Sequence, residues 1–393
     1  MKKLLFICQY YYPERIGLTD ICEYLVKNEY DVTVLTGLPN YPEGKVPKEY
    51  KLFRKRKEII NGVKVKRCFE IGRRKGKVWL AINYISFLIS SVFHAFFLGK
   101  KYDEVICYQH SPITMGVSAV LYKKLYKKAL TLYCFDLWPE SIKTYNIKES
   151  NIIFKIFKKI SKFVYKNCNK ILISSKPFEE YLVSNFNIDR NSISYLPQHS
   201  KDYTLDKKNK KKDNKIHFLF AGNIGKMQNI ECIIKAANEI KKDDNFIVDI
   251  VGYGSNYDDL VELTKKLKLE DKILFHGQKK QDEMLEYYAN ADIMLLTLKG
   301  NTFVSKTLPL KLQSYMSTGK PILGSIEGAA EEVINESGCG ICIKPDDYKL
   351  LAKKMSYLIK NKEVLKDMGK KSREYYDKNF DFDKLMEKFE KEL

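Results

Sequence analysis

The sequence predicts an α/β protein with two domains in tandem, each built around a parallel β-sheet. Short, nearly continuous apolar runs alternate with segments of helical periodicity along the chain, a pattern typical of parallel strands covered by helices on both faces. A polar, lysine-rich stretch at 201–215 interrupts this series once. The 393 residues also exceed what one hydrophobic core usually holds.

The first series of elements begins with a βαβ unit. Strands are predicted at Leu4–Cys8 and Asp31–Thr36, with an amphipathic helix at about Ile16–Lys27 between them. Helical segments then separate four further predicted strands, at Glu104–Tyr108, Leu130–Phe135, Ile171–Ser174 and Ile193–Leu196.

The second series follows the polar stretch. We therefore expect an N-terminal domain at 1–200, a linker at 201–215, a C-terminal domain at 216–375 and a segment at 376–393 whose amphipathic helix returns to the first domain. The predicted strands of the second domain are His217–Ala221, Phe246–Val251, Ile273–Phe275, Ile293–Thr297, Pro321–Gly324 and Ile341–Ile343.

Composition excludes several classes. Hydrophobic residues make up 45% of the chain, which is far too many for a disordered protein. The nine cysteines are scattered and odd in number, and no signal sequence opens the chain, so we expect a reduced cytoplasmic protein. Cys339 and Cys342 form a solitary CxxC, and the histidines show no ligand spacing, so no metal site is expected.

The net charge of +20 is unevenly distributed: residues 1–200 carry +17 and the remainder +3. Such an excess fits nucleic acid, an anionic membrane or a phosphorylated acceptor as a partner. The alternative is a lysine-rich proteome that decorates all its surfaces, which the asymmetry argues against.

One segment, Val78–Leu98, is apolar and long enough to cross a bilayer. It contains several polar residues and lies between strands of one predicted sheet, so we favour a helix on the sheet face that touches the membrane surface. The basic block Lys51–Lys77 before it is interpreted as a positive loop suited to anionic lipid, with a solvated loop as the alternative.

Glycines and lysines in the second domain predict an anion site. Gly222 and Gly225 follow a strand and precede a helix, which alone is a weak phosphate signal. Gly252 and Gly254 end the next strand, and Lys306 and Lys311 stand near the start of a later helix. Cations and helix N-termini in this order suit a diphosphate.

These motifs together resemble family 4 glycosyltransferases of the GT-B fold, especially the WbuB-like branch that builds bacterial surface polysaccharides. The similarity covers nearly the whole chain and rests on QYYYPERIG at 9–17, TGLPNYPEG at 36–44, DLWPES at 136–141, YLPQ at 195–198, FAGNIG at 220–225 and PLKLQSYM at 309–316.

The resemblance implies two Rossmann-like domains that face each other across a cleft, with the acceptor on the first and the nucleotide on the second. It implies retaining transfer of a sugar, a hexosamine or deoxy sugar, from a UDP-sugar to a polyprenyl-diphosphate-linked oligosaccharide in capsule, O-antigen or exopolysaccharide synthesis. No cofactor, metal or nucleic acid is expected. The predicted location is the cytoplasmic face of the cell membrane, held peripherally on its anionic surface.

The resemblance also implies site residues. The predicted sites are catalytic His110 and Asp136; a donor diphosphate site of Gly222, Asn223, Gly225, Lys226, Lys306 and Lys311; a nucleotide site of Gly252, Gly254 and Gln313; and an acceptor-side loop with Arg15 and Gly17.

Two departures from the family pattern bear on the donor site. Ser305 and Gln313 stand where many members have glutamates that hold the ribose, and Asn223 and Gln228 stand where members often have Arg and Lys. An amide still bonds a hydroxyl, but without a carboxylate's strength. Among the remaining lysines, Lys311 is the first candidate for the diphosphate.

The two catalytic candidates have ordinary structural alternatives. His110 follows a strand, where family members often have a histidine near the reacting sugar, and an imidazole there bonds the donor sugar or orients the acceptor hydroxyl. A histidine at a strand end is more often structural. Asp136 ends the next strand, where a helix-capping role is the alternative.

Other functions stay open. A GT-B nucleotide-sugar epimerase would release a free product without an acceptor. Loss of both glutamates would also fit a degenerate, non-catalytic GT-B subunit. A basic nucleic-acid-binding protein is the weakest alternative, because no known RNA or DNA module is visible.

Overall fold

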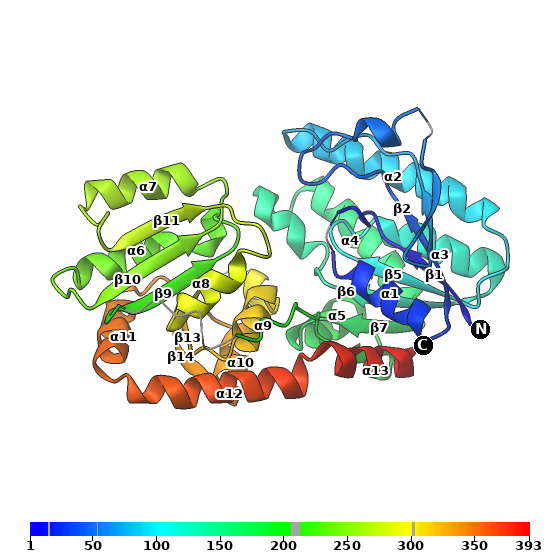
Figure 1. Ribbon diagram of the computed structural model, residues 1–393. Coiled ribbons are helices and arrows are strands. Elements are labelled where there is room, and N and C mark those ends of the chain that lie inside the picture. Colours follow the sequence, from blue (N-terminus) through cyan, green and yellow to red (C-terminus); the bar gives the residue numbers. More distant parts are fainter. Residues whose placement is uncertain (15, 53, 206–212, 301–302) are drawn as a thin grey trace. The chain divides into compact units, whose positions relative to one another are not determined.

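The computed structural model describes residues 1–393 except 15, 53, 206–212 and 301–302. The chain divides into two compact units, 1–198 with 386–393, and 199–385 (Figure 1). The first division falls two residues before the expected end of the first domain. The second unit continues past 375, so the return to the first unit involves only the last residues of the chain.

The first unit contains an eight-stranded sheet in the order β3-β4-β2-β1-β5-β6-β7-β8. All neighbouring strands are parallel except β3 and β4. The strands are β1 (Lys3–Ile7), β2 (Asp31–Thr36), β3 (Lys57–Ile60), β4 (Val63–Arg67), β5 (Glu104–Gln109), β6 (Ala129–Cys134), β7 (Lys170–Ile173) and β8 (Ile193–Tyr195).

The β3–β4 hairpin corrects the interpretation of the Lys51–Lys77 block as a loop. Asn61 and Gly62 have φ of 48° and 83°, the left-handed pair that a tight hairpin turn requires. In β4 (Val63–Arg67), odd-numbered positions are buried and even-numbered ones more exposed, the period of two that a half-buried strand shows. The lysines of this block therefore lie partly on an edge hairpin.

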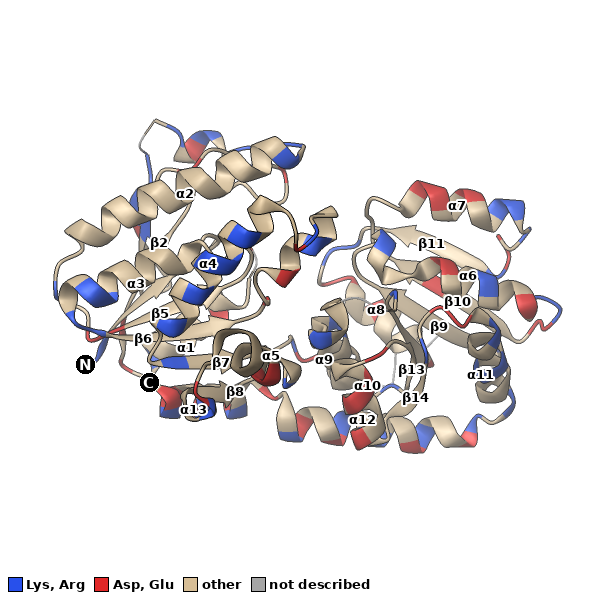
Figure 2. Cartoon of the chain, turned by 180° about the vertical axis from the view of Figure 1, so that it is seen from behind, with Lys and Arg blue, Asp and Glu red and all other residues tan. Residues whose placement is uncertain are grey.

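Helices cover the first sheet, and α2, α3 and α4 lie side by side on one face (Figure 2). The helices of this unit are α1 (Leu18–Lys27), α2 (Lys77–Phe97), α3 (Met115–Tyr126), α4 (Ile152–Lys166) and α5 (Pro177–Phe186).

The end of the chain packs on the first unit. Within α13 (Phe382–Glu392), the fully buried Phe389 ring lies 6.4 Å from Phe6 and 6.0 Å from Tyr133, centroid to centroid. Tyr24 donates a hydrogen bond to Glu390 at 3.1 Å. Residues 386–393 are thus part of the core of the first unit.

The second unit contains a six-stranded, fully parallel sheet in the order β11-β10-β9-β12-β13-β14. Its strands are β9 (Ile216–Ala221), β10 (Phe246–Val251), β11 (Ile273–Gly277), β12 (Ile293–Thr297), β13 (Ile322–Ser325) and β14 (Gly340–Ile343). Its helices are α6 (Ile230–Glu239), α7 (Tyr257–Lys266), α8 (Met284–Asn290), α9 (Leu310–Ser317), α10 (Ala329–Ser337), α11 (Tyr348–Lys360) and α12 (Glu363–Asn379).

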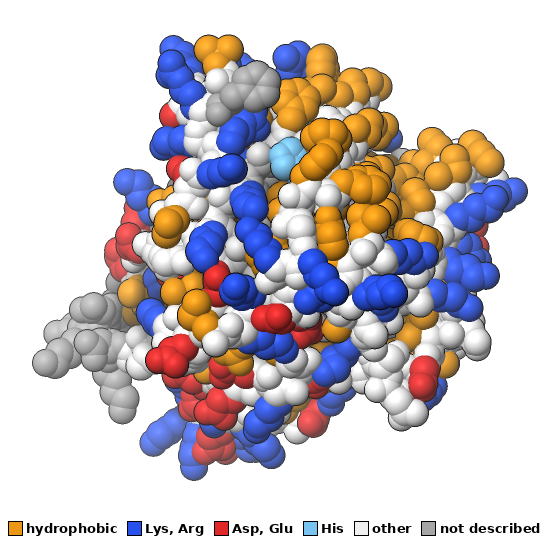
Figure 3. Space-filling model, turned by 90° about the vertical axis from the view of Figure 1, so that its right-hand side faces the viewer, with side chains coloured by type: hydrophobic (Ala, Val, Ile, Leu, Met, Phe, Trp, Pro, Cys, Tyr) orange, Lys and Arg blue, Asp and Glu red, His pale blue; other side chains and the backbone are white. Residues whose placement is uncertain are grey.

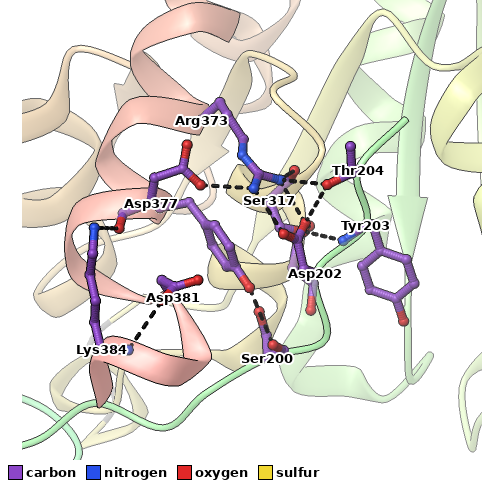
Figure 4. A network of polar contacts seen from close by, with 11 residues as sticks. Ser200, Asp202, Tyr203, Thr204, Ser317, Arg373, Asp377, Asp381 and Lys384 are labelled. Atoms are coloured by element: carbon purple, nitrogen blue, oxygen red, sulfur yellow. Dashed lines mark hydrogen bonds and ion pairs between the residues drawn. The ribbon is translucent and has the colours of Figure 1, made fainter. Parts of the chain in front are cut away.

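The first residues of the expected linker are fixed to the second unit (Figure 4). Asp202 forms an ion pair with Arg373 of α12, with a shortest N–O distance of 2.6 Å. The Tyr203 amide donates to the Ser317 hydroxyl at 3.1 Å, and Arg373 also donates to the Ser317 carbonyl at 2.7 Å. The linker segment 201–205 is therefore anchored, while 206–212 lies outside the described residues.

Candidate functional site

The carboxyl ends of β9 and β10 meet through glycines. Gly222 and Gly252 have φ of +139° and +138°, a region that favours glycine. A Cβ on Gly252 would lie 1.9 Å from the Gly222 carbonyl oxygen, and one on Gly254 would lie 2.5 Å from that of Ile224. The two βα loops are therefore packed backbone to backbone, and the amides of Gly222, Ile224 and Gly252 donate to the carbonyls of Val251, Tyr253 and Gly277.

A buried tyrosine holds α9 against this edge. The Tyr315 hydroxyl accepts a hydrogen bond from the Ala221 amide at 2.8 Å and donates to the Ala221 carbonyl at 3.0 Å. Both backbone groups of the last β9 residue are thus satisfied by one side chain. This pair fixes the start of the Gly222 loop relative to α9, which carries Lys311.

Lys311 places a cation beside the Gly222 loop. Its Nζ donates to the Gln228 amide oxygen and lies 4.1 Å from the centre of the Phe220 ring. A Cβ on Gly222 would lie 2.8 Å from Lys311 Cε. Burial lowers the pKa of Lys311 to about 7, because no carboxylate offsets the loss of hydration. An anion bound here would restore the full charge.

Gln313, two residues further along α9, is buried, and its Oε1 has no hydrogen-bond partner among the described residues. A buried amide oxygen without a donor is costly, and a ligand hydroxyl would supply that donor. The Ser305 backbone contacts Gly328, where an added Cβ would lie 2.3 Å from the Ser305 carbonyl oxygen. Ser305 thus packs against the start of α10, with the exposed Lys306 next to it in the chain.

The other predicted phosphate residues lie around the turn after β9. Asn223 is exposed, and Gly225 has an extended φ of −100°. Lys226 lines a cavity of about 270 Å³ together with Asn229, Asn256 and Lys299, among other residues. Neither Gly222 nor Lys311 lines this cavity, and the Lys226 side chain is exposed.

In the first unit, His110 directly follows β5. Its ring stacks on Phe135 at 4.7 Å with a 17° angle between the planes and meets Tyr108 edge-on at 5.1 Å. Burial lowers the pKa of His110 below its usual value, against the raising effect of the Asp136 carboxylate. His110 Nε2 has no partner among the described residues. A neutral imidazole with an unused nitrogen is suited to bond a hydroxyl.

Asp136 follows β6, which pairs with β5, the strand that His110 follows. Its carboxylate accepts a hydrogen bond from Ser111 at 2.7 Å, and Ser111 accepts one from the Trp138 indole at 3.1 Å. Gln109 Nε2 donates to the carbonyls of both His110 and Asp136, at 2.9 and 3.1 Å. The two predicted catalytic residues are therefore brought together by one side chain between the β5 and β6 loops.

The predicted acceptor-side loop is only partly described. Arg15 lies outside the described residues, and Gly17 precedes α1 as its N-cap residue, with a φ of −60°. Glu14 is the residue whose contacts organise this region: its Oε1 accepts from the amides of Asn40 and Tyr41, each at 2.7 Å. Sequence reasoning missed this role, although Glu14 lies within the quoted QYYYPERIG motif.

A second buried carboxyl, Glu70, was also missed. Its Oε1 accepts from Gln9 at 2.7 Å, Asn83 at 2.5 Å and Asn40 at 3.3 Å. Burial raises the pKa of Glu70 to about 8, so the carboxyl is largely protonated at neutral pH. These four side chains tie β1, β2, β4 and α2 together at one edge of the sheet. No local motif marks Glu70, because its partners are distant in sequence.

Glu70→Gln is expected to make the protein more stable at alkaline pH. The folded-state pKa of about 8 exceeds the ordinary value near 4.3, so the folded state retains a proton that the unfolded chain has lost. Stability from this group is complete below about pH 4.3 and is lost as pH rises through 8. Urea unfolding of both proteins should show a difference that grows by up to about 1.4 kcal/mol per pH unit in this range. A difference independent of pH would contradict the assignment.

Among the described residues, no group of three or more His, Cys, Asp or Glu side chains is placed to hold a metal ion. Cys339 and Cys342 are free thiols.

Comparison with known proteins adds three findings. Residues 202–375 match the family described as glycosyl transferases group 1. N-acetyl-alpha-D-glucosaminyl L-malate synthase of Bacillus anthracis is 28% identical over 44% of this chain, but the match spans only 43% of that enzyme. The putative colanic acid biosynthesis glycosyl transferase WcaI of Escherichia coli is 21% identical, and the alignment covers 96% of each chain.

Among solved structures, HepE from Anabaena in complex with UDP has a TM-score of 0.71 at 12% identity, covering 100% of this chain and 99% of HepE. This likeness shows the fold. The two Rossmann-like units, the second with a glycine and lysine cradle, define a GT-B protein. Residues 202–375 thus form a glycosyl transferases group 1 domain, and the relatives named as glycosyltransferases support the family 4 resemblance seen in the sequence. The matches do not single out the WbuB-like branch.

Proposed function

We propose that this protein is a retaining glycosyltransferase that transfers a sugar from a UDP-sugar to a lipid-linked oligosaccharide during the synthesis of a bacterial surface polysaccharide. The donor sugar is a hexosamine or a deoxy sugar, and the product belongs to a capsule, O-antigen or exopolysaccharide. No metal ion takes part in the transfer. The retaining outcome and the donor class come from the family 4 resemblance.

The observation that carries the proposal is the position of Lys311. Its ammonium lies beside a glycine turn with φ of +139° at the carboxyl end of β9, the edge at which parallel α/β sheets bind ligands. The colanic acid relative WcaI aligns over 96% of the chain, which supports the polysaccharide assignment. HepE, a structural neighbour, was solved with UDP and with UDP-glucose, which supports uridine as the nucleotide.

The proposed chemistry places positive charge where negative charge develops. As the bond between the sugar's anomeric carbon and the diphosphate breaks, charge grows on the departing oxygen. Lys311, beside the Gly222 loop, stabilises that oxygen without a metal ion. The bond from the anomeric carbon to the acceptor oxygen forms on the same face, and the acceptor's proton passes to the departing diphosphate.

In the first unit, His110 and Asp136 serve the acceptor. His110 has an unused Nε2 and a lowered pKa, so it accepts or donates a hydrogen bond to a sugar hydroxyl without adding charge. Asp136 is held by Ser111 at 2.7 Å and orients a second hydroxyl. Both are proposed as positioning groups for the acceptor sugar.

The charge of the first domain supports the proposed acceptor class. Residues 1–200 carry +17, and a polyprenyl diphosphate presents an anionic headgroup at an anionic leaflet. We therefore place the protein on the cytoplasmic face of the membrane as a peripheral protein.

The test is a transfer assay in the presence of a chelator. Purified protein is incubated with UDP-hexosamines or UDP-deoxy sugars and polyprenyl-diphosphate-linked oligosaccharides, and the anomeric configuration of the product is determined by NMR. We expect a lipid-linked product with the donor's anomeric configuration. Inverted configuration would contradict the retaining mechanism, and a free epimerised sugar formed without acceptor would favour an epimerase. Absence of turnover with every donor would favour a non-catalytic subunit.

A further inference from the structure

Helix α2 presents an apolar stripe to solvent, whereas its buried stripe is half polar. Surface helices normally turn their apolar side inward and their polar side to water. Two stripes at four-residue spacing run along opposite sides of α2. The buried stripe is Asn83, Phe87, Ser91 and Ala95, and the exposed stripe is Ile85, Ile89, Phe93 and Phe97.

The exposure of this stripe is large. Ile89, Phe93 and Phe97 are 65%, 61% and 74% exposed, and the Phe93 and Phe97 rings contact each other at 4.8 Å. By length and composition α2 is long enough to span a membrane, and it is the one such helix among the described residues. A stripe of this kind is too apolar to be an ordinary solvated surface.

The apolar surface continues across the neighbouring helices. Leu125 of α3 is exposed, and α4 adds a run at its N-terminal end and a phenylalanine further along. Lys124 of α3 lies 5.0 Å from the centre of the Phe163 ring of α4. We define the apolar face as the exposed residues Val78, Ile85, Ile89, Phe93, Phe96, Phe97, Leu125, Ile152, Ile153, Ile156 and Phe163. Figure 3 shows hydrophobic side chains gathered on this side of the first unit, with basic side chains around them.

The three helices that carry the apolar face bear charged side chains of one sign, and the exposed Glu149 before α4 is paired with Lys143. The ranges of α2, α3 and α4, all of whose residues the structure describes, contain no Asp or Glu. Lysines lie along α4, as the blue bands in Figure 2 show, and further basic residues lie at both ends of α2. The exposed ones are Lys155, Lys158, Lys159, Lys162 and Lys166 on α4, with Arg74, Lys75, Lys77, Lys100 and Lys101 beside α2.

The fold excludes a transmembrane orientation of α2. The strands before and after it, β4 and β5, belong to the same sheet, so both ends of α2 lie on one side of any bilayer. Asn83 also donates to the buried Glu70 at 2.5 Å, which holds this helix on the unit. The exposed stripe therefore meets a membrane only with the helix lying flat.

We propose that the apolar face is a membrane-docking surface, in which α2 and α4 lie in the plane of an anionic bilayer. The apolar side chains enter the boundary between headgroups and acyl chains, and the surrounding lysines contact anionic headgroups. Charge complementarity selects a bilayer over a second copy of this chain, because two copies would bring like-charged rims together. The docking surface specifies how the proposed peripheral attachment is made. Only the role of that attachment, access to a lipid-linked acceptor, rests on the proposed function.

The test uses the full chain without nucleotide or acceptor. Cosedimentation is measured with phosphatidylcholine vesicles and with vesicles that also contain about 30% phosphatidylglycerol, at low and moderate salt. We expect binding to the anionic vesicles that weakens with salt. Failure of the wild-type chain to bind them at moderate salt would overturn the proposal. The response of unfolding temperature to UDP, measured on the same protein, reports the donor site separately.

Two sets of variants separate the apolar and charged contributions. I89S/F93S/F97S should weaken binding at least about tenfold, because three exposed apolar groups no longer enter the bilayer. K155Q/K158Q/K159Q/K162Q should lose about fivefold per lysine on anionic vesicles. Matched controls in the second unit, L274S/L285S/Y357S and K349Q/K353Q/K360Q/K366Q, should bind like the wild type, and the unfolding temperature of every variant should be unchanged.

Three further results would overturn the proposal. Unchanged vesicle binding by I89S/F93S/F97S would mean that the apolar face does not enter lipid. Equal losses in the lysine controls would mean that net charge alone drives binding. A dimer seen by sedimentation, lost in I89S/F93S/F97S and accompanied by no vesicle binding, would make a second copy the occupant of this face.

Discussion

Replacing Lys311 by methionine is expected to lower kcat/KM for sugar transfer by about 100- to 1,000-fold, the usual cost of losing one group that stabilises charge in a transition state. Methionine keeps much of the side-chain volume against Phe220 but removes the ammonium from the Gly222 loop. The unfolding temperature of the unliganded variant should hold or rise at pH 7, because burial has lowered the pKa of Lys311 to about 7 and the folded state no longer pays to hold that charge. Transfer rates and thermal unfolding measure the two effects.

The matched control is Lys353→Met on α11, an exposed lysine of the same unit, which should leave both quantities unchanged. Wild-type activity in Lys311→Met would remove Lys311 from the donor site. A fall in activity together with a large fall in unfolding temperature would indicate a structural role instead.

The same lysine predicts a pH dependence of nucleotide binding. With a pKa of about 7, the unliganded amine is neutral above that pH and must take up a proton when a diphosphate binds. UDP affinity should therefore fall by up to about tenfold per pH unit above pH 7. Calorimetry in buffers of different ionisation enthalpy should detect this proton uptake in the wild type. The same proton uptake in Lys311→Met would contradict the assignment.

Gly252→Ala is expected to abolish UDP binding and to lower the free energy of unfolding by about 2–4 kcal/mol. The new Cβ would lie 1.9 Å from the Gly222 carbonyl oxygen, at a φ of +138°, so the two loops must separate. Urea unfolding and UDP titration measure the two losses.

A neighbouring glycine supplies the control. Gly277 has a φ of +66°, but a Cβ there would meet no atom within 4 Å. Gly277→Ala should therefore cost only the backbone strain, about 1 kcal/mol, and should retain UDP binding. Equal effects of the two substitutions would show that the contact with Gly222 does not matter.

The strands near the donor site could be predicted because local sequence determines them. The loops after β9 and β10 need glycine at the positions that follow the strands, because the backbone there has a positive φ. Both parallel sheets are predicted by apolar runs that alternate with helices. The β3–β4 hairpin was missed although its Asn61-Gly62 turn is a strong signal. The many charged residues around this turn favoured a loop, although buried and exposed positions alternate along β4.

The rest of the site depends on contacts between distant residues. Glu70 accepts hydrogen bonds from Gln9, Asn40 and Asn83. These four residues are far apart in the sequence, so no local pattern predicts their contact. The exposed apolar stripe of α2 could not be predicted, because apolar residues occur on several sides of this helix and do not reveal which side packs on the sheet. Sequence position already favoured Lys311 over Lys226, and the fold adds that Lys311 lies beside Gly222 while Lys226 is exposed.

The central claim is a UDP-binding site that uses Lys311 and needs no metal ion. Its most direct test is thermal unfolding of the wild type and of Lys311→Met with UDP, with GDP and without nucleotide, all in chelator. At about 100 times its dissociation constant a ligand adds about 2.7 kcal/mol, which raises the midpoint by several degrees. We predict this shift for the wild type with UDP, and none with GDP or in Lys311→Met. No shift of the wild type with UDP would contradict the claim.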